Sequence, residues 1–257
     1  MQAPLSHRQH DILQRVHGDG RATIDALAQQ YRVSPQTIRR DVNALCAAGQ
    51  LRRVHGGVET PRSSNILYTS RRRLNEGAKQ NIAHCFAKLI PSGASLAVSI
   101  GTTPEIAVQS LETQVDLMVL TNNLNIALYG CDREGWGVQI PGGTLRAGDQ
   151  DILGPQVEAF FRRYQADFGV FGVGGVSEDG TLLDFTEEEV AVRMAIQRNC
   201  RCSILLLDHS KFGRAAHVRG GRIEDVDYVI SDMPVPAACA EALGERGVEM
   251  IIAEDAK

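Results

Sequence analysis

The sequence predicts an α/β protein built from two parts, a small N-terminal domain of short helices and a larger body of alternating strands and helices. Up to residue 50 the apolar residues recur at helical spacing, whereas from residue 78 onward short apolar runs alternate with helical segments, as βα units do. We therefore expect a first domain over residues 1–58, a polar linker over residues 59–77 and an α/β domain over residues 78–257.

Charge is divided unevenly between these parts. Residues 1–73 hold twelve arginines and no lysine against five acidic residues, a net charge of +7. The remainder holds fifteen basic and twenty-six acidic residues, a net charge of −11. The whole-chain charge of −4 argues against a nucleic-acid binder, but its distribution suggests a polyanion partner for the first part alone. A solvated basic surface would give the same pattern.

The overall composition is that of an ordinary folded protein, with 43% hydrophobic and 23% charged residues. No apolar run approaches the roughly 20 residues that span a membrane, and the N-terminus has no signal-peptide core. The six cysteines form no C-x-x-C pair, so we expect free thiols. We therefore expect a cytoplasmic protein with no membrane partner, no metal and no cofactor.

Three short helices are predicted before residue 50. Ser6 and Gln9 form a capping box for the first helix, and Thr23 caps the second. The third begins at Ser34, a good N-cap, followed by Pro35 at the first helical position. Its apolar stripe consists of Ile38, Val42 and Leu45. Two helices joined by so tight a turn, the second capped by Ser-Pro, are typical of a helix-turn-helix.

The start of the third helix carries side chains that can contact DNA. The helix N-terminus favours an anion, and polar or basic side chains there can pair with base edges and phosphates. These residues are Ser34, Gln36, Thr37, Arg39 and Arg40. On this helix alone, a solvated amphipathic helix is an equally good interpretation.

A two-stranded β wing is predicted after the third helix. The segment 51–54 alternates apolar and basic residues, and a Gly-Gly turn follows it. Arg52, Arg53 and His55 lie near its tip, where they can contact the phosphate backbone. Helix-turn-helix and wing together predict a winged helix that binds double-stranded DNA. The alternative is a small basic domain that docks a protein.

In the body, one strand end has the chemistry of a phosphate site. The buried strand 96–100 runs into Gly101, Thr102 and Thr103, with Pro104 expected at the first position of the next helix. Glycine permits close approach, hydroxyls donate, and the N–H groups of a helix start point at an anion. A short strand–loop–helix turn without a ligand is the ordinary alternative.

Similar chemistry follows several other predicted strands. Because open α/β sheets bind ligands at the carboxyl ends of their strands, we expect these residues to gather around a small anionic polyol such as a sugar or glycerol phosphate. Ordinary turn chemistry is the alternative. No dinucleotide fingerprint or P-loop is present. The candidate residues are Asn122, Asn123, Gly142, Gly143, Arg146, Gly174, Gly175 and Lys211.

Three runs in the chain resemble one family of bacterial regulators. Residues 33–41, together with Arg53-Val54-His55-Gly56-Gly57, resemble the N-terminal domain of DeoR-family repressors. Residues 100–105, 121–127 and 208–214 are similar to the sensor domain of that family, whose fold is similar to ribose-5-phosphate isomerase. The resemblance implies two partners: operator DNA and a phosphorylated effector, for which glycerol 3-phosphate is expected.

The resemblance also implies positions for the effector. Its phosphate is expected near Gly101–Thr103 and either Arg146 or Lys211, and its polyol end near Asn122 and Asn123. One recognition helix contacts few bases, so we expect a homo-oligomer, a dimer or tetramer, on the operator. The polar linker ends in the run Arg71-Arg72-Arg73, which we expect to be solvated, with contact to DNA as the alternative.

The rival class is a sugar-phosphate isomerase, which needs a base at carbon and a group that stabilises the enediolate. The acidic run 187–189 is more typical of the first turn of a helix. The isomerases of similar fold carry a lysine near a Gly-rich stretch, where this chain has residues 182–185. With no catalytic residue assigned, the sequence predicts a repressor rather than an enzyme; a regulator of another sugar phosphate is the closest alternative.

Overall fold

The computed structural model describes residues 5–19, 21–47, 50–54, 56–59 and 68–253. Contacts divide the chain into two units, Met1–Ile66 and Leu67–Lys257, and each is described by itself. The division falls inside the predicted linker. None of the helices in the described ranges is long and apolar enough to cross a membrane.

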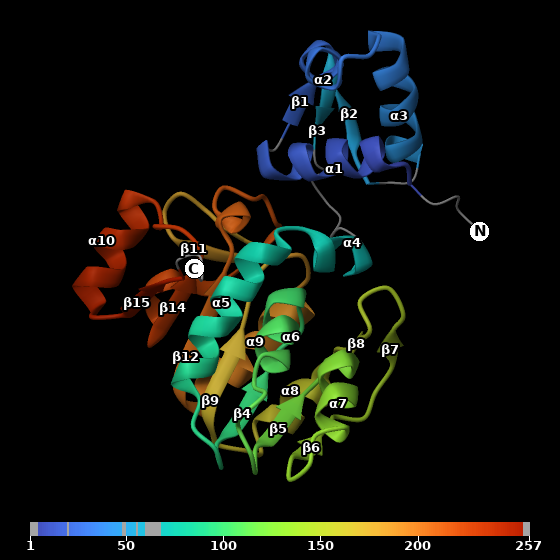
Figure 1. The fold of residues 1–257 in the computed structure, drawn as a ribbon. Helices are drawn as coiled ribbons and strands as arrows, with labels where there is room; N and C mark the ends of the chain where they lie inside the picture. The colour runs from blue at the N-terminus through green and yellow to red at the C-terminus, as the bar shows by residue number, and fades with distance from the viewer. Residues whose placement is uncertain (1–4, 20, 48–49, 55, 60–67, 254–257) are drawn as a thin grey trace. The chain divides into compact units, whose positions relative to one another are not determined.

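The N-terminal unit consists of three helices and a small sheet (Figure 1). The caps predicted from the sequence are present: Ser6 and Gln9 exchange hydrogen bonds at 2.9 and 3.2 Å, and the Thr23 hydroxyl accepts from the Ala26 N–H at 3.2 Å. The elements are α1 (His7–Asp19), β1 (Arg21–Thr23), α2 (Ile24–Tyr31), α3 (Pro35–Ala47), β2 (Arg52–Val54) and β3 (Gly57–Glu59).

The predicted wing is part of a larger sheet. Strand β3 pairs with β2 and also with β1, giving a three-stranded antiparallel sheet in the order β1-β3-β2. The predicted two-stranded wing is therefore present as β2 and β3, and β1 is an additional strand that was not predicted. Strand β1 has three residues, of which the middle one is half-buried and the other two are exposed. So short an alternation of apolar and polar residues cannot be recognised from the sequence.

The second unit is organised around a seven-stranded, all-parallel sheet in the order β15-β14-β12-β9-β4-β5-β6. Its strands are β4 (Ser95–Val98), β5 (Met118–Thr121), β6 (Gly137–Gln139), β9 (Ala166–Phe171), β12 (Cys200–Leu207), β14 (Tyr228–Ser231) and β15 (Glu249–Ile252). Beside it lie the hairpin β7 (Leu145–Arg146) and β8 (Asp151–Ile152), and an antiparallel sheet of β10 (Gly175–Val176), β11 (Thr181–Asp184) and β13 (Val218–Arg222).

Helices cover both faces of the parallel sheet (Figure 1). One face packs Leu96, Val98 and Leu206 against α5 and α6, and the opposite face packs Ala97 and Leu205 against α8 and α9. This alternation along each strand is the pattern of a sheet buried on both sides. The helices are α4 (Tyr68–Arg73), α5 (Glu76–Leu89), α6 (Thr102–Gln109), α7 (Leu124–Cys131), α8 (Pro155–Phe161), α9 (Glu187–Arg198) and α10 (Ala237–Arg246), with 3₁₀ turns η1 (His209–Lys211) and η2 (Ile223–Asp225).

Two local expectations were wrong. Residues 68–73 form helix α4, where the sequence predicts a polar linker, and Arg71 is largely buried rather than solvated. Helix α6 begins at Thr102, so Pro104 occupies its third position and not its first. Strand β4 ends at Val98, and Gly101 is the N-cap of α6 with φ +121°, a conformation that side chains rarely adopt. This lets the helix start two residues earlier.

Candidate functional site

Helix α3 is held in the N-terminal unit by a capped start and one buried face. The Ser34 hydroxyl accepts a hydrogen bond from the Thr37 N–H at 3.2 Å, which caps the first turn. Its inner face consists of the fully buried Ile38, Val42 and Leu45. The predicted DNA-contacting residues are the exposed Ser34, Gln36, Arg39 and Arg40 and the half-buried Thr37. The helix therefore presents polar and basic side chains to solvent at its N-terminal end.

An ion pair orients this helix. The Arg8 Nε donates to a carboxylate oxygen of Asp41 at 2.6 Å, and Asp41 is buried. The contact joins α1 to α3 and neutralises the acidic residue that follows the two exposed arginines. An unpaired carboxylate there would repel DNA phosphates.

The wing arginines already have partners within the unit. The Arg52 Nε donates to Glu59 across the wing at 2.8 Å, and Arg53 donates to the Asn43 side chain on α3 at 2.5 Å. Both arginines are exposed and keep further N–H groups, so phosphate contact by them stays a prediction. His55 lies outside the described residues.

In the second unit the strand order reverses between β4 and β9. From β4 the chain proceeds through β5 and β6 to one edge, and from β9 through β12, β14 and β15 to the other. Such a reversal leaves room for a ligand at the carboxyl ends of the two central strands. The segments that follow β4, β5, β9 and β12 carry most of the predicted effector residues.

The segment after β4 offers the start of a helix to this place. Gly101 is the N-cap of α6, and no side chain caps the helix within the described residues. Thr102 and Thr103 are buried in its first turn. Glu105 is fully buried, and burial raises the pKa of its carboxyl to about 7. The helix start therefore has unused N–H groups, and its acidic residue is half neutral near pH 7.

Basic side chains gather near the buried carboxylate of Asp208, which follows β12: the charges of Lys211 and Lys79 act on it, and it acts on Arg214. We call Arg71, Lys79, Lys211 and Arg214 the cation cluster, because their charges act on Asp208 or on one another. Asp208 itself accepts hydrogen bonds from the Asn75 amide at 2.9 Å and the Ser210 N–H at 3.1 Å.

Burial, with smaller contributions from neighbouring cations, lowers the pKa values of the cation cluster. Burial, followed by the charge of Arg214, lowers the pKa of Lys211 to about 7. Burial also lowers the pKa of Lys79 to about 8 and that of Arg214 to about 10. A bound anion would stabilise the charged forms of all these groups. The arrangement is therefore suited to hold a phosphate dianion.

The two asparagines after β5 differ in how their side chains are used. The Asn123 amide oxygen accepts from the N–H groups of Asn125 at 2.9 Å and Ile126 at 3.4 Å, so this residue caps α7. The Asn122 amide nitrogen donates to the Ile152 carbonyl at 2.8 Å. Its amide oxygen is buried with no hydrogen-bond partner within the described part of the chain, which leaves an acceptor for a ligand hydroxyl.

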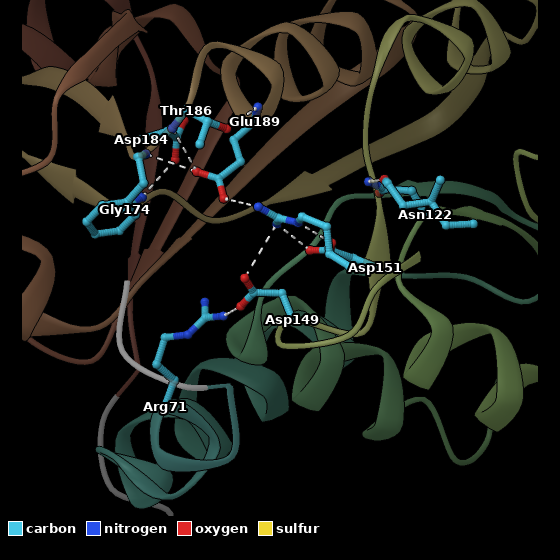
Figure 2. A network of polar contacts seen from close by, with 11 residues as sticks. Arg71, Asn122, Asp149, Asp151, Gly174, Asp184, Thr186 and Glu189 are labelled. Carbon is cyan, nitrogen blue, oxygen red and sulfur yellow. Dashed lines mark hydrogen bonds and ion pairs between the residues drawn. The ribbon is translucent and has the colours of Figure 1, made fainter. Parts of the chain in front are cut away.

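Arg146 is enclosed by the carboxylates of Asp149, Asp151 and Glu189, which Figure 2 labels. Its guanidinium makes two hydrogen bonds of 2.7 Å to Asp151 and one of 3.2 Å to Glu189, and it lies 3.7 Å from Asp149. The two-pronged contact that the sequence suggests for a phosphate is thus made with Asp151. Glu189 in turn accepts from the N–H groups of Phe185 and Thr186, as part of the capping box of α9.

The glycine pairs lie in two different settings. Gly142 and Gly143 are exposed between β6 and β7, whereas Gly174 and Gly175 are buried after β9. The Gly174 N–H donates to Asp184 at 2.8 Å. A Cβ on Gly175 would lie 2.1 Å from the Arg214 carbonyl oxygen, so packing alone requires this glycine. Effector contact by these four residues stays a prediction.

Two family models match the chain. The DeoR-like helix-turn-helix domain matches residues 8–64, and the DeoR C terminal sensor domain matches residues 74–233. The chain belongs to the DeoR family. It is therefore a DNA-binding transcriptional repressor, not an enzyme, with a helix-turn-helix domain for DNA and a sensor domain for a small-molecule effector. The family and the two-domain α/β fold predicted from the sequence are confirmed.

Several DeoR-family repressors are similar over nearly the whole chain. The glycerol-3-phosphate regulon repressor of Escherichia coli is 37% identical over 95% of this chain and 98% of its own length. That of Haemophilus influenzae is 39% identical over 96% of both chains. Among solved structures, ribose 5-phosphate isomerase A from Methanocaldococcus jannaschii shares 15% identity, with a TM-score of 0.38 over 54% of this chain and 55% of its own.

Three members of the cation cluster in this DeoR-family chain, Arg71, Lys79 and Arg214, were not predicted from the sequence. Lys79 and Arg214 follow no predicted strand end closely enough to be chosen, and Arg71 was assigned to a solvated linker. One signal was available: the helical segment α5 has a lysine at position 79 that falls on the same face as Ile82 and Phe86. A lysine on a buried helix face requires partners.

Proposed function

We propose that this DeoR-family repressor binds glycerol 3-phosphate at the carboxyl ends of its central strands, and that binding lowers its affinity for operator DNA. The observation that carries the proposal is the cation cluster, in which burial and neighbouring cations lower the pKa values of Lys79 and Lys211. The uncapped start of α6 and Lys211 follow β4 and β12, whose carboxyl ends lie at the same edge of the parallel sheet. Binding of a dianion to such a site is favourable, because the anion stabilises the charged lysines and accepts hydrogen bonds from the helix N–H groups.

The role proposed for each residue follows from the hydrogen-bond donors and acceptors that it can offer to the effector. The phosphate would accept from the N–H groups and hydroxyls of Gly101–Thr103 and from Lys211. A hydroxyl of the effector would donate to the Asn122 amide oxygen, whose lack of a partner otherwise costs free energy. Asn123 and the four glycines Gly142, Gly143, Gly174 and Gly175 complete the set predicted from sequence, as residues that shape the surrounding loops.

Between the two candidates for the main phosphate contact, we assign Lys211. Three carboxylates lie around Arg146, so its charge is balanced and a phosphate there would meet their repulsion. Lys211 has three other cations near it and one carboxylate. A dianion is attracted to the second setting and not to the first.

The choice of glycerol 3-phosphate is supported by the relatives. Two glycerol-3-phosphate regulon repressors match 95–96% of this chain at 37–39% identity. Another phosphorylated sugar is the alternative, because the cation cluster recognises the phosphate and not the carbon chain.

Operator binding is proposed to use a homo-oligomer. One α3 helix reaches few base pairs, and two copies on adjacent half-sites give the specificity that a regulator needs. For the effector to act, it must bind the arrangement that is poor at holding DNA more tightly than the other arrangement.

The test is fluorescence polarisation of the full chain on labelled DNA from its own promoter, with and without glycerol 3-phosphate at fixed salt. Salt is held constant because phosphate contacts make the affinity depend on ionic strength. The proposal expects specific binding that glycerol 3-phosphate weakens, while fructose 1-phosphate and glucose 6-phosphate do not. Binding that only another phosphate ester weakens would replace the effector. Binding insensitive to all three would remove the assigned effector class.

The DNA face is tested by one matched pair of variants. Arg39→Ala removes an exposed cation from the start of α3 and is expected to cost operator affinity about 1–3 kcal/mol. Arg198→Ala removes an exposed arginine from α9 and is expected to change nothing. Equal operator affinities for both variants would contradict the placement of α3 on DNA.

A further inference from the structure

Helix α4 lies over the strand-end residues rather than apart from them. The Tyr68 hydroxyl is 3.5 Å from the amide nitrogen of Asn123, which donates to it, and Tyr68 is buried. Arg72 lies 3.4 Å from the carboxylate of the buried Glu105 on α6. One short helix thus touches the segments after both β4 and β5.

The turn that follows α4 continues these contacts. The Asn75 amide donates to Asp208 at 2.9 Å, and the Lys79 ammonium donates to the carbonyl of Leu74 at 2.6 Å and to that of Arg71. Two of the four cluster cations, Arg71 and Lys79, are therefore joined to one another through the backbone of α4. The helix is built into the proposed effector site.

Arg71 is held by a carboxylate that it can exchange for another anion. Its guanidinium donates through one terminal nitrogen to Asp149, between β7 and β8 (Figure 2). It also lies over the Tyr68 ring, 5.4 Å from the ring centroid. Its Nε is buried with no hydrogen-bond partner in the described residues. The charge of Arg71 also reaches Lys211 and Arg214, whose pKa values it lowers. The guanidinium therefore lies between an acidic partner and the cation cluster, with one donor unused.

We propose that Arg71 is an effector-binding residue: its guanidinium leaves Asp149 and donates to the anionic group of the effector, and α4 shifts with it. This inference rests on the proposed function. A phosphate dianion accepts two parallel N–H bonds from an arginine and carries more charge than a carboxylate, so it competes favourably with Asp149. The Nε would then gain the partner that it now lacks.

The position of Arg71 makes the contact a means of signalling. Helix α4 is the first described element after the DNA-binding unit, whose last described residue is Glu59. An anion that pulls on Arg71 acts directly on this element, without a change in the core of the sheet. Asp149 acts as the competing partner that restores the effector-free position.

The experiment measures two quantities on the full chain: the dissociation constant of glycerol 3-phosphate by calorimetry, and the factor by which saturating glycerol 3-phosphate weakens operator binding. Arg71→Ala is expected to weaken effector binding by about tenfold or more and to reduce the factor. Arg71→Lys, which keeps the charge but not the planar fork, is expected to lie between it and the wild type. Arg73→Ala removes an exposed arginine from the same helix and is expected to change neither quantity.

Asp149→Asn separates a ligand role from a structural ion pair. It frees the guanidinium, so it is expected to tighten effector binding several-fold and to weaken operator binding before effector is added. If Asp149→Asn weakens effector binding as Arg71→Ala does, the pair is only structural and the inference is wrong. If the wild type responds to glycerol 3-phosphate while Arg71→Ala and Arg73→Ala respond alike, the inference fails and the proposed function stands. If the wild type does not respond, both fail.

Discussion

Lys211, shortly after β12, and Arg146, in the hairpin strand β7, are both cations of the sensor domain, yet their surroundings are opposite. Arg146 has Asp149, Asp151 and Glu189 around it, two of them within hydrogen-bonding distance. The groups of the described chain that most affect the pKa of Lys211 are the cations Arg214, Lys79 and Arg71 and the carboxylate of Asp208. Residue type and position in the sequence indicate a candidate anion site, but the sum of the neighbouring charges decides whether an anion binds there favourably.

The largest expected effect is on folding stability. Arg146→Ala leaves the buried carboxylates of Asp151 and Glu189 uncompensated, and we expect it to lower the free energy of unfolding by about 3 kcal/mol. The effector dissociation constant of the folded protein should be little changed. Urea unfolding followed by the fluorescence of Trp136, the single tryptophan, reports on the sensor domain alone.

The control for that variant is Arg162→Ala, which breaks an exposed helical pair with Glu158. We expect it to cost less than about 1 kcal/mol. If Arg146→Ala abolished effector binding without changing the free energy of unfolding, Arg146 would be the phosphate contact, and the assignment of that role to Lys211 would be wrong.

The next effect concerns the effector. Lys211→Ala is expected to weaken glycerol 3-phosphate binding by about 2 kcal/mol, the contribution of one hydrogen bond to a charged group. Stability should not fall, because the lysine is crowded by cations in the free protein. Calorimetric titration of the variant against Lys88→Ala, an exposed lysine at the end of α5, measures the difference. Unchanged affinity in Lys211→Ala would remove Lys211 from the site.

How far the sequence predicted these features depends on how local their causes are. The helices and caps of the N-terminal unit depend on residues three or four apart, so Ser6, Thr23 and Ser34 were predicted correctly as caps. The places where strands end in the sensor domain were predicted for similar reasons. Apolar runs followed by glycine, threonine or asparagine are short patterns.

Short sequence patterns could not predict contacts between residues that are far apart in the chain. Arg71 meets Asp149 after 78 residues, Asn75 meets Asp208 after 133, and Arg146 meets Glu189 after 43. Each pairing depends on the order of strands in the sheet, which a single sequence does not reveal. That is why Arg71 was expected in solvent and Arg146 was expected to be available for phosphate.

A smaller effect is expected from pH. In the free protein Lys211 loses its proton as pH rises through about 7, and Lys79 does so at about 8. A bound dianion favours the protonated amines, so binding above pH 7 takes up protons. Effector affinity should therefore fall as pH rises from 7 to 9, by at most about tenfold per pH unit for each proton taken up.

Calorimetry in buffers of different ionisation enthalpy counts those protons. Below about pH 6 the effector phosphate itself loses charge, so the titrations are kept above that value. Lys211→Arg keeps a charge at every pH and is expected to flatten the dependence. A pH-independent affinity in the wild type would mean that the lysines are not beside the anion.

The smallest expected effect tests the other side of the phosphate site, the start of α6. Thr102→Ala removes a buried hydroxyl from the first turn but leaves the backbone N–H groups and the cations in place. One neutral hydrogen bond contributes about 1 kcal/mol, so effector affinity should fall about fivefold, well short of Lys211→Ala. Thr113→Ala, an exposed threonine beyond the helix, should have no effect on the same titration. If Thr102→Ala weakened effector binding as much as Lys211→Ala does, the contacts at the start of α6, and not the charge of the cation cluster, would dominate binding of the phosphate.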